Sequence, residues 1–288
     1  GDRRAASGLA LVRPDLRDPL RSTTFGTGKL IQAALDAGAR EILLGIGGSA
    51  TVDGGCGCAQ ALGVTFLNRA GEPCICGLAG GGLPDIDRID LSDRDARIAA
   101  TKIRVACDVT NPLTGPQGAA RVYAPQKGAT PEVVEQLEAG LRHLAAVIRR
   151  SLAVDVEPLA GAGAAGGLGG GLVAFLGATL ERGVEVVASA VGLARRLAGA
   201  DLCLTGEGKL DSQSRSGKTA FGVSEIARQA SVPTVCIPGQ ASDDAPRESF
   251  AGVYPLVSQD VPVRQAMLHG PDLLRRRAAQ AVREHLGR

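Results

Sequence analysis

Apolar and polar positions along the chain follow a pattern that predicts short buried strands and amphipathic helices in succession. The run "EILLGI" at residues 41–46 is short, apolar and bounded by turn residues, which is typical of a buried strand. Before it, apolar residues recur at helical spacing in "TGKLIQAALDAG", and Gly38 predicts the end of that helix. A glycine-rich loop and a helix through "CAQAL" follow. This strand–loop–helix order predicts an α/β fold.

The middle of the chain contains one further strand and the clearest helix. Residues 68–96 are rich in Gly, Pro and Asp and are predicted to be a loop, and residues 102–107 are predicted to be a strand. The helix is expected to begin after Thr130, a capping residue, with Pro131 in its first turn. The segment "LAGAGAAGGLGGGLVAFLGATL" then predicts a glycine-rich turn that leads into a helix.

From about residue 180 the pattern changes to regular β/α alternation. The expected elements are strands at 201–205, 233–237 and 252–257, a helix within 216–230 and a last helix from residue 272. The change predicts two domains, residues 1–180 and residues 181–288, with no low-complexity linker between them.

Composition argues against nucleic-acid binding and membrane insertion. The formal net charge is +2 and aromatic residues make up 2%, so neither a basic surface nor stacking platforms favour nucleic acid as a partner. No apolar run is long enough to cross a bilayer, and the seven Cys fit reduced thiols in the cytoplasm. A zinc or thiol site at Cys56 and Cys58 is a less favoured alternative, because the spacing is wrong for zinc and no His is near. The sequence is compatible with a homodimer but does not establish one.

Four glycine-rich polar segments each follow an apolar run. In parallel α/β sheets such loops line the ligand crevice, and glycine lets backbone N–H groups approach an oxyanion. Their convergence would suit a substrate with several anionic oxygens. The four segments are Gly45–Gly55, Asp108–Gly118, Gly161–Gly170 and Thr205–Thr219.

The first loop, "GIGGSATVDGG", has a single carboxylate. Gly47, Gly48 and Ser49 offer donors, and Asp53 is either a catalytic acid or a helix cap. Both interpretations stay open on the residues alone. The glycine spacing does not match a dinucleotide fingerprint.

Two middle motifs add candidate ligands for a substrate. Asp108 stands at a strand end, and Asn111 precedes a proline that holds it extended, although a rigid connection explains Asn111 equally well. Lys127 lies among small residues in "APQKGA", and the alternative is a solvated surface lysine.

The loop "TGEGKLDSQSRSGKT" is the densest in charge. Glu207 and Asp211 are expected to hold Mg²⁺, and Lys218 to neutralise phosphate charge. The alternative is a salt-bridged surface turn. A P-loop is not supported, because Ser212 stands where that motif requires glycine.

Taken together, five motifs in order resemble the glycerate kinase family of the bacterial type I class, and the resemblance runs from near Arg4 to the C-terminus. The motifs are "GIGGSATVDGGCGCAQALG", "ACDVTNPLTGPQGA", "APQKGATPE", "GAGAAGGLGGGLVAFLGA" and "ADLCLTGEGKLDSQSRSGKT".

The resemblance implies a two-domain α/β fold, with parallel or mixed sheets, flanking helices and the active site in an interdomain cleft. It implies a kinase that uses ATP and Mg²⁺ to convert D-glycerate to 2-phosphoglycerate or 3-phosphoglycerate. Residues 1–180 would be the substrate-side domain and residues 181–288 an incomplete Rossmann-like domain. Family members usually carry a further N-terminal segment that nothing here matches, and they commonly have Asn where this chain has Val52.

The same residues can be given roles from their chemistry. Asp53 and Lys218 are expected to be catalytic, Asp53 by orienting the accepting hydroxyl or taking its proton. Glycerate is expected to bind at Gly47, Gly48, Ser49, Asp108, Asn111 and Lys127. The nucleotide is expected at Thr205, Gly206, Gly208, Gln213 and Gly217, with Mg²⁺ on Glu207 and Asp211. The alternative function is a nucleotide- or organic-acid-binding module without turnover.

Overall fold

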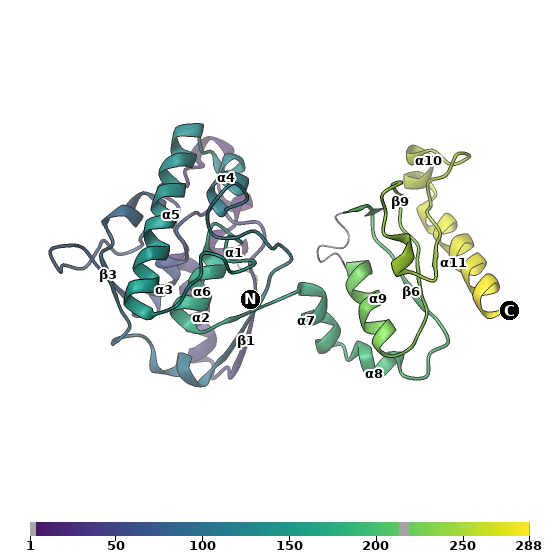
Figure 1. Cartoon of the computed structure of the whole chain (residues 1–288), viewed down its shortest axis with the longest axis horizontal. Helices are drawn as coiled ribbons and strands as arrows, with labels where there is room; N and C mark the ends of the chain where they lie inside the picture. Colours follow the sequence, from purple (N-terminus) through teal and green to yellow (C-terminus); the bar gives the residue numbers. More distant parts are fainter. Residues whose placement is uncertain (1–3, 213–218, 288) are drawn as a thin grey trace. The chain divides into compact units, whose positions relative to one another are not determined.

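The computed structural model describes residues 4–212 and 219–287. Contacts divide the chain into two compact units, Gly1–Glu181 and Arg182–Arg288. Each unit contains its own sheet and helices (Figure 1). We call them unit 1 and unit 2.

The sheet of unit 1 has three parallel strands in the order β1-β4-β5. They are β1 (Glu41–Gly45), β4 (Lys102–Ala106) and β5 (Thr179–Glu181). Ile42 pairs with Ile103, and Arg104 pairs with Thr179. Along β1 exposed and buried residues alternate, as the period of two in a strand requires. The predicted strands at 41–46 and 102–107 are therefore confirmed.

Helices lie around this sheet and close its core (Figure 1). They are α1 (Arg4–Ser7), α2 (Phe25–Asp36), α3 (Cys56–Ala61), α4 (Ala119–Tyr123), α5 (Pro131–Leu152) and α6 (Leu168–Leu176). The long helix α5 begins after Thr130, whose Oγ1 accepts a hydrogen bond from the Val133 N–H at 3.4 Å. Its buried face carries Leu137, Leu141 and Leu144, which pack into the main core.

The prediction of a loop over residues 68–96 holds only in part, because a 3-10 helix and a short strand lie within this range. β2 (Thr65–Leu67) and β3 (Arg88–Asp90) pair as a two-stranded antiparallel ribbon, and a 3-10 helix (Gly80–Asp85) lies between them in sequence. These strands have three residues each and pair over a long sequence separation, so the local pattern carries little signal for them. The other 3-10 helices are Leu9–Leu11, Pro14–Leu16, Ala96–Ala100, Pro125–Lys127 and Arg247–Ser249.

Unit 2 contains a second parallel sheet in the order β10-β8-β6, and a parallel pair β7-β9. The strands are β6 (Cys203–Thr205), β7 (Lys209–Leu210), β8 (Thr234–Cys236), β9 (Gln240–Ala241) and β10 (Gly252–Val253). The helices are α7 (Gly183–Ala190), α8 (Leu193–Leu197), α9 (Thr219–Gln229), α10 (Val263–Leu268) and α11 (Gly270–Leu286). The predicted strands and the last helix are confirmed, whereas α7 and α8 were not predicted.

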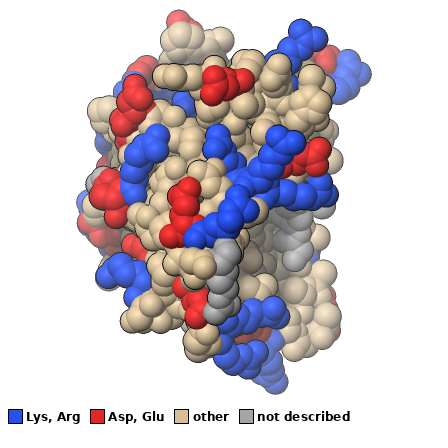
Figure 2. All heavy atoms as spheres, turned by 90° about the vertical axis from the view of Figure 1, so that its right-hand side faces the viewer, with Lys and Arg blue, Asp and Glu red and all other residues tan. Residues whose placement is uncertain are grey.

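Figure 2 faces the side of the molecule on which α11 lies in Figure 1. Lys and Arg side chains lie close to Asp and Glu side chains on this face. On α11, Arg275 forms an ion pair with Asp272 at 2.7 Å. Among the described residues, no helix combines the length and the apolar character needed to span a membrane. The predicted α/β class with parallel sheets and flanking helices is confirmed, and the cleft between domains stays a prediction.

Helices α2 and α3 approach each other so closely at Gly28 that a side chain does not fit there. A Cβ added at Gly28 would lie 2.3 Å from the Cys58 carbonyl oxygen and 2.6 Å from the Ala61 Cβ. Gly28→Ala is therefore expected to lower the free energy of unfolding by about 1–3 kcal/mol, although alanine favours helices. Urea unfolding followed by circular dichroism would measure it.

Gly270 supplies the matched control for that substitution. A Cβ at Gly270 would meet no atom within 4 Å, so Gly270→Ala should change stability by less than about 0.5 kcal/mol. Equal stability of the Gly28→Ala variant and the wild type would contradict the close helix contact.

Candidate functional site

A pocket of about 250 Å³ lies at the carboxyl ends of β1 and β4 in unit 1. Its position is the one at which parallel α/β sheets generally bind ligands. The lining residues are Leu9, Ile46, Gly47, Gly48, Ser49, Ala106, Cys107, Asp108, Val109, Tyr123, Gln126, Lys127, Ala164 and Ala165. Five of the six residues predicted to bind substrate thus share one pocket, which we call the unit 1 pocket.

Backbone N–H groups of the first glycine loop are available in this pocket. Gly48 adopts a left-handed φ of 70°, and the Leu9 N–H donates to the Gly48 carbonyl at 2.9 Å, which holds the loop in place. Within the described part of the chain, no hydrogen bond uses the N–H groups of Gly47, Gly48 or Ser49. A Cβ at Gly47 would meet nothing within 4 Å, so the space before the loop is open. Such a row of N–H groups is suited to an oxyanion.

Lys127 places a cationic group in the pocket. Its side chain is only 2% exposed, and Nζ donates to Ser49 Oγ and to the Thr51 carbonyl, both at 2.7 Å. The alternative of a solvated surface lysine is therefore wrong. Because Ser49 Oγ accepts from Lys127, its own hydroxyl proton points elsewhere and is available to a ligand.

Asp108 and Asn111 follow β4 and have different positions. Asp108 is a lining residue and contributes a carboxylate group to the pocket. Asn111 is not among the lining residues; its Nδ2 donates to the Gln117 carbonyl at 2.7 Å and its Oδ1 accepts from the Tyr123 hydroxyl at 2.6 Å. Asn111 therefore supports a pocket residue, Tyr123, through a hydrogen bond.

Asp53 is fully buried and lies outside the pocket lining. Its Oδ2 accepts from the Thr24 N–H and the Thr24 hydroxyl, both at 2.7 Å, and from the Gly57 N–H at 3.3 Å. Its Oδ1 accepts from the Gly55 N–H at 3.1 Å. These partners join the start of α2 to the start of α3. The geometry favours the structural interpretation of Asp53 that the sequence left open beside the catalytic one.

Burial raises the pKa of Asp53, against the opposing effect of the hydrogen bonds from Thr24, Gly55 and Gly57. A carboxyl whose folded pKa is raised contributes stability below its ordinary pKa and loses that contribution as pH rises through the folded value. Wild-type stability relative to Asp53→Asn should therefore fall as pH rises from about 4 towards neutral. Urea unfolding of both proteins across this range measures it, and a rising difference would contradict the direction of the shift.

A second pocket, of about 570 Å³, lies in unit 2 at the ends of β6 and β8. We call it the unit 2 pocket. Its polar side is the loop Thr205–Gly208, and its apolar side comes from the β8 end and from α11. The lining residues are Leu204, Thr205, Gly206, Glu207, Gly208, Ile237, Gly239, Leu256, Leu274 and Ala278. Four residues predicted for nucleotide or metal thus share this pocket.

Two loops are held close together at the base of the unit 2 pocket. The Gly239 N–H donates to the Glu207 carbonyl at 2.8 Å, and a Cβ at Gly239 would lie 2.6 Å from the Gly208 carbonyl oxygen. Glycine is therefore required at position 239 by the close approach of backbone. Asp211 is not among the lining residues, and its Oδ2 lies 3.9 Å from Lys209 Nζ. The predicted residues Gln213, Gly217 and Lys218 lie outside the described residues.

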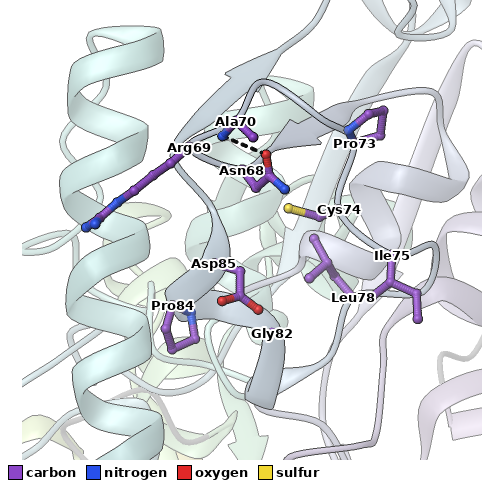
Figure 3. Close-up of a pocket in the computed structure, with 10 residues that line it drawn as sticks. All are labelled: Asn68, Arg69, Ala70, Pro73, Cys74, Ile75, Leu78, Gly82, Pro84 and Asp85. Carbon is purple, nitrogen blue, oxygen red and sulfur yellow. Dashed lines mark hydrogen bonds between the residues drawn. The ribbon is translucent and has the colours of Figure 1, made fainter.

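A further pocket, of about 720 Å³, borders the β2–β3 ribbon (Figure 3). It contains none of the predicted site residues. Its Asn68 side chain accepts from the Ala70 N–H at 2.9 Å and from the Glu72 N–H at 3.0 Å, so that side chain closes a turn. No group of three or more His, Cys, Asp or Glu side chains within the described ranges is placed to hold a metal ion.

Sequence reasoning missed several lining residues of both pockets. Tyr123 directly precedes the motif "APQKGA" that contains Lys127, so the position of that motif at a pocket could have indicated it. Leu274 and Ala278 are four residues apart on α11, a helical spacing that places both on one face. Ala164 and Ala165 lie in Gly161–Gly170, one of the four segments expected to line the crevice, although neither residue was singled out within it.

Comparison with known proteins places these motifs in one family. The model of the glycerate kinase family matches residues 2–286. The glycerate kinase of Halalkalibacterium halodurans is 46% identical over 276 residues, which cover 95% of this chain and 72% of the relative. The glycerate 2-kinase of Escherichia coli is 48% identical over 240 residues, which cover 83% of this chain and 62% of the relative.

A solved structure shows the same fold. A crystal structure named as glycerate kinase 2 from Salmonella typhimurium LT2 matches with a TM-score of 0.77 and 45% identity, covering 97% of this chain and 76% of that one. The family model spans nearly the whole chain, and the two relatives above are named glycerate kinase and glycerate 2-kinase. This chain therefore belongs to the glycerate kinase family.

Proposed function

We propose that this chain phosphorylates D-glycerate with ATP and Mg²⁺, with glycerate bound in the unit 1 pocket. The observation that carries the proposal is the meeting of Gly47, Gly48, Ser49, Asp108 and Lys127 in one pocket with unused backbone donors. A pocket of about 250 Å³ suits a three-carbon acid. The names of the relatives support glycerate as the substrate.

The proposed placement of glycerate in the unit 1 pocket follows from charge and hydrogen bonding. The carboxylate accepts from the N–H groups of Gly47–Ser49 and the Ser49 hydroxyl, beside the positive charge of Lys127. Asp108 accepts a hydrogen bond from the reacting hydroxyl and orients it, a role that the buried position of Asp53 does not suit. Asp53 acts by holding the loop between β1 and α3 in shape.

The nucleotide is proposed to bind in the unit 2 pocket. Its base packs against apolar side chains such as Ile237 and Leu274, and its phosphates lie along Thr205, Gly206 and Gly208. Glu207 and Asp211 are carboxylates, the oxygen donors that Mg²⁺ prefers, and they would hold an ion that neutralises phosphate charge. Gln213, Gly217 and Lys218 keep their proposed roles in binding and charge neutralisation.

A coupled assay of ADP release with D-glycerate, ATP and Mg²⁺ tests the activity. We expect ADP release that depends on D-glycerate, and phosphorus NMR of the product is expected to show 2-phosphoglycerate. A signal from 3-phosphoglycerate would correct the position of transfer. Binding of D-glycerate or ATP without any ADP release would contradict the kinase proposal and support a binding module.

A further inference from the structure

Tyr123 lines the unit 1 pocket and was not singled out by any motif. It is the last residue of α4, which begins after Gly118 in a tight turn. A Cβ at Gly118 would lie 2.5 Å from the Thr114 carbonyl carbon, so this tight turn has no room for a side chain. Tyr123 lines the same pocket as Gln126 and Lys127, which follow it closely in the chain.

The hydrogen bonds around Tyr123 fix the direction of its hydroxyl proton. The Gln117 carbonyl can only accept, so Asn111 must turn its Nδ2 towards it, at 2.7 Å. Asn111 Oδ1 then faces Tyr123 Oη at 2.6 Å, and an amide oxygen can only accept. The single hydroxyl proton of Tyr123 is thus committed to Asn111. What Tyr123 Oη can offer a ligand is a lone pair.

This acceptor complements the other polar groups of the pocket. The N–H groups of Gly47–Ser49 and the ammonium of Lys127 suit a carboxylate, which an acceptor such as Tyr123 Oη would repel. A ligand hydroxyl, by contrast, can donate to it. Burial raises the pKa of Tyr123, so the phenol keeps its proton, and its hydrogen bond to Asn111, at neutral pH.

We propose that Tyr123 accepts a hydrogen bond from the hydroxyl of glycerate that is not phosphorylated, and so selects acids with two hydroxyl groups. The inference rests on the proposed function for the identity of the ligand. It makes Tyr123 a specificity-determining residue and Asn111 its positioning residue. Hydroxy acids that lack the second hydroxyl would leave the Tyr123 lone pair without a donor and bind more weakly.

The test compares Tyr123→Phe with the wild-type 288-residue chain by isothermal titration. The ligands are D-glycerate, D-lactate, which lacks the 3-hydroxyl, and 3-hydroxypropionate, which lacks the 2-hydroxyl. The variant keeps the ring and loses only the hydroxyl. We expect D-glycerate affinity to fall about 3–10-fold, while affinity for the analogue that lacks the Tyr123-bound hydroxyl stays unchanged. The affinity gap between these two ligands should close.

Tyr254 supplies the control. It is the other tyrosine of the chain, and its hydroxyl donates to Glu284 at 2.5 Å in unit 2, outside the lining of both proposed pockets. Tyr254→Phe should leave all three affinities unchanged. Thermal melting of both variants checks that each is folded.

The outcomes separate this inference from the proposed function. Equal loss of affinity for all three ligands, no loss for any, or no binding of D-glycerate to the wild type would overturn the role of Tyr123. A closed affinity gap in a chain that releases no ADP would support the selectivity role and contradict the kinase activity. If ADP release depends on D-glycerate but Tyr123→Phe leaves the affinity gap unchanged, the kinase activity is supported and the selectivity role of Tyr123 is contradicted.

Discussion

Asp53→Ala is expected to destabilise unit 1 by about 3–5 kcal/mol. The substitution removes the acceptor for the Thr24 N–H and hydroxyl and for the N–H groups of Gly55 and Gly57. These donors surround a carboxylate with no exposed surface, so water cannot replace it without a rearrangement. The starts of α2 and α3 would lose their common link. Urea unfolding followed by circular dichroism measures the loss.

Asp36→Ala is the matched control, because the Asp36 side chain is 62% exposed and pairs with Arg97 at 2.8 Å on the surface. Its cost should stay below about 0.5–1 kcal/mol. A structural role for Asp53 predicts that stability and activity fall together. An Asp53→Ala variant with wild-type stability and abolished turnover would instead support the catalytic role that the sequence allows.

Lys127→Met is expected to lower kcat/KM for D-glycerate by about 10²–10³-fold. The variant keeps the length of the buried side chain and removes the charge that lies beside Ser49 and the Thr51 carbonyl. Without it, the substrate carboxylate loses its cationic neighbour and Ser49 loses the donor that directs its hydroxyl proton. Steady-state kinetics with varied D-glycerate measure the effect, and affinity for ATP should not change.

Lys29→Met is the control, since Lys29 is exposed on α2 and donates to Gln32 at 2.9 Å. It should leave kcat/KM within about twofold of the wild type. Circular dichroism of Lys127→Met establishes that the chain is folded. A folded Lys127→Met variant with wild-type kcat/KM would contradict the proposed role of Lys127 in binding glycerate.

The elements that sequence predicted correctly are those with strong local signals. The strand over 41–46 is an apolar run between turns, and α5 has a cap at Thr130 and an unbroken apolar stripe. The ribbon of β2 and β3 escaped prediction because three-residue strands depend on a partner distant in sequence. Helices α7 and α8 are short, and five of the eight α7 residues are Val or Ala, which favour no single element strongly.

The candidate site shows the same division between local and tertiary information. Glycine-rich loops after strands identified Gly47, Gly48 and Ser49, because loops at the ends of parallel strands converge for topological reasons. Residue type alone could not decide between a catalytic and a structural Asp53, nor between a solvated and a buried Lys127. Those choices depend on burial and on partners that are distant in sequence, such as Thr24 for Asp53 and Ser49 for Lys127, which are more than twenty-five residues away.

Backbone amide NMR of the 288-residue chain during titration with D-glycerate tests most directly whether glycerate binds on the first glycine loop. We expect saturable shifts of the Gly47, Gly48 and Ser49 amide signals, because their N–H groups have no other partner among the described residues and would donate to the carboxylate. Saturable D-glycerate binding that leaves these three signals unmoved would contradict it.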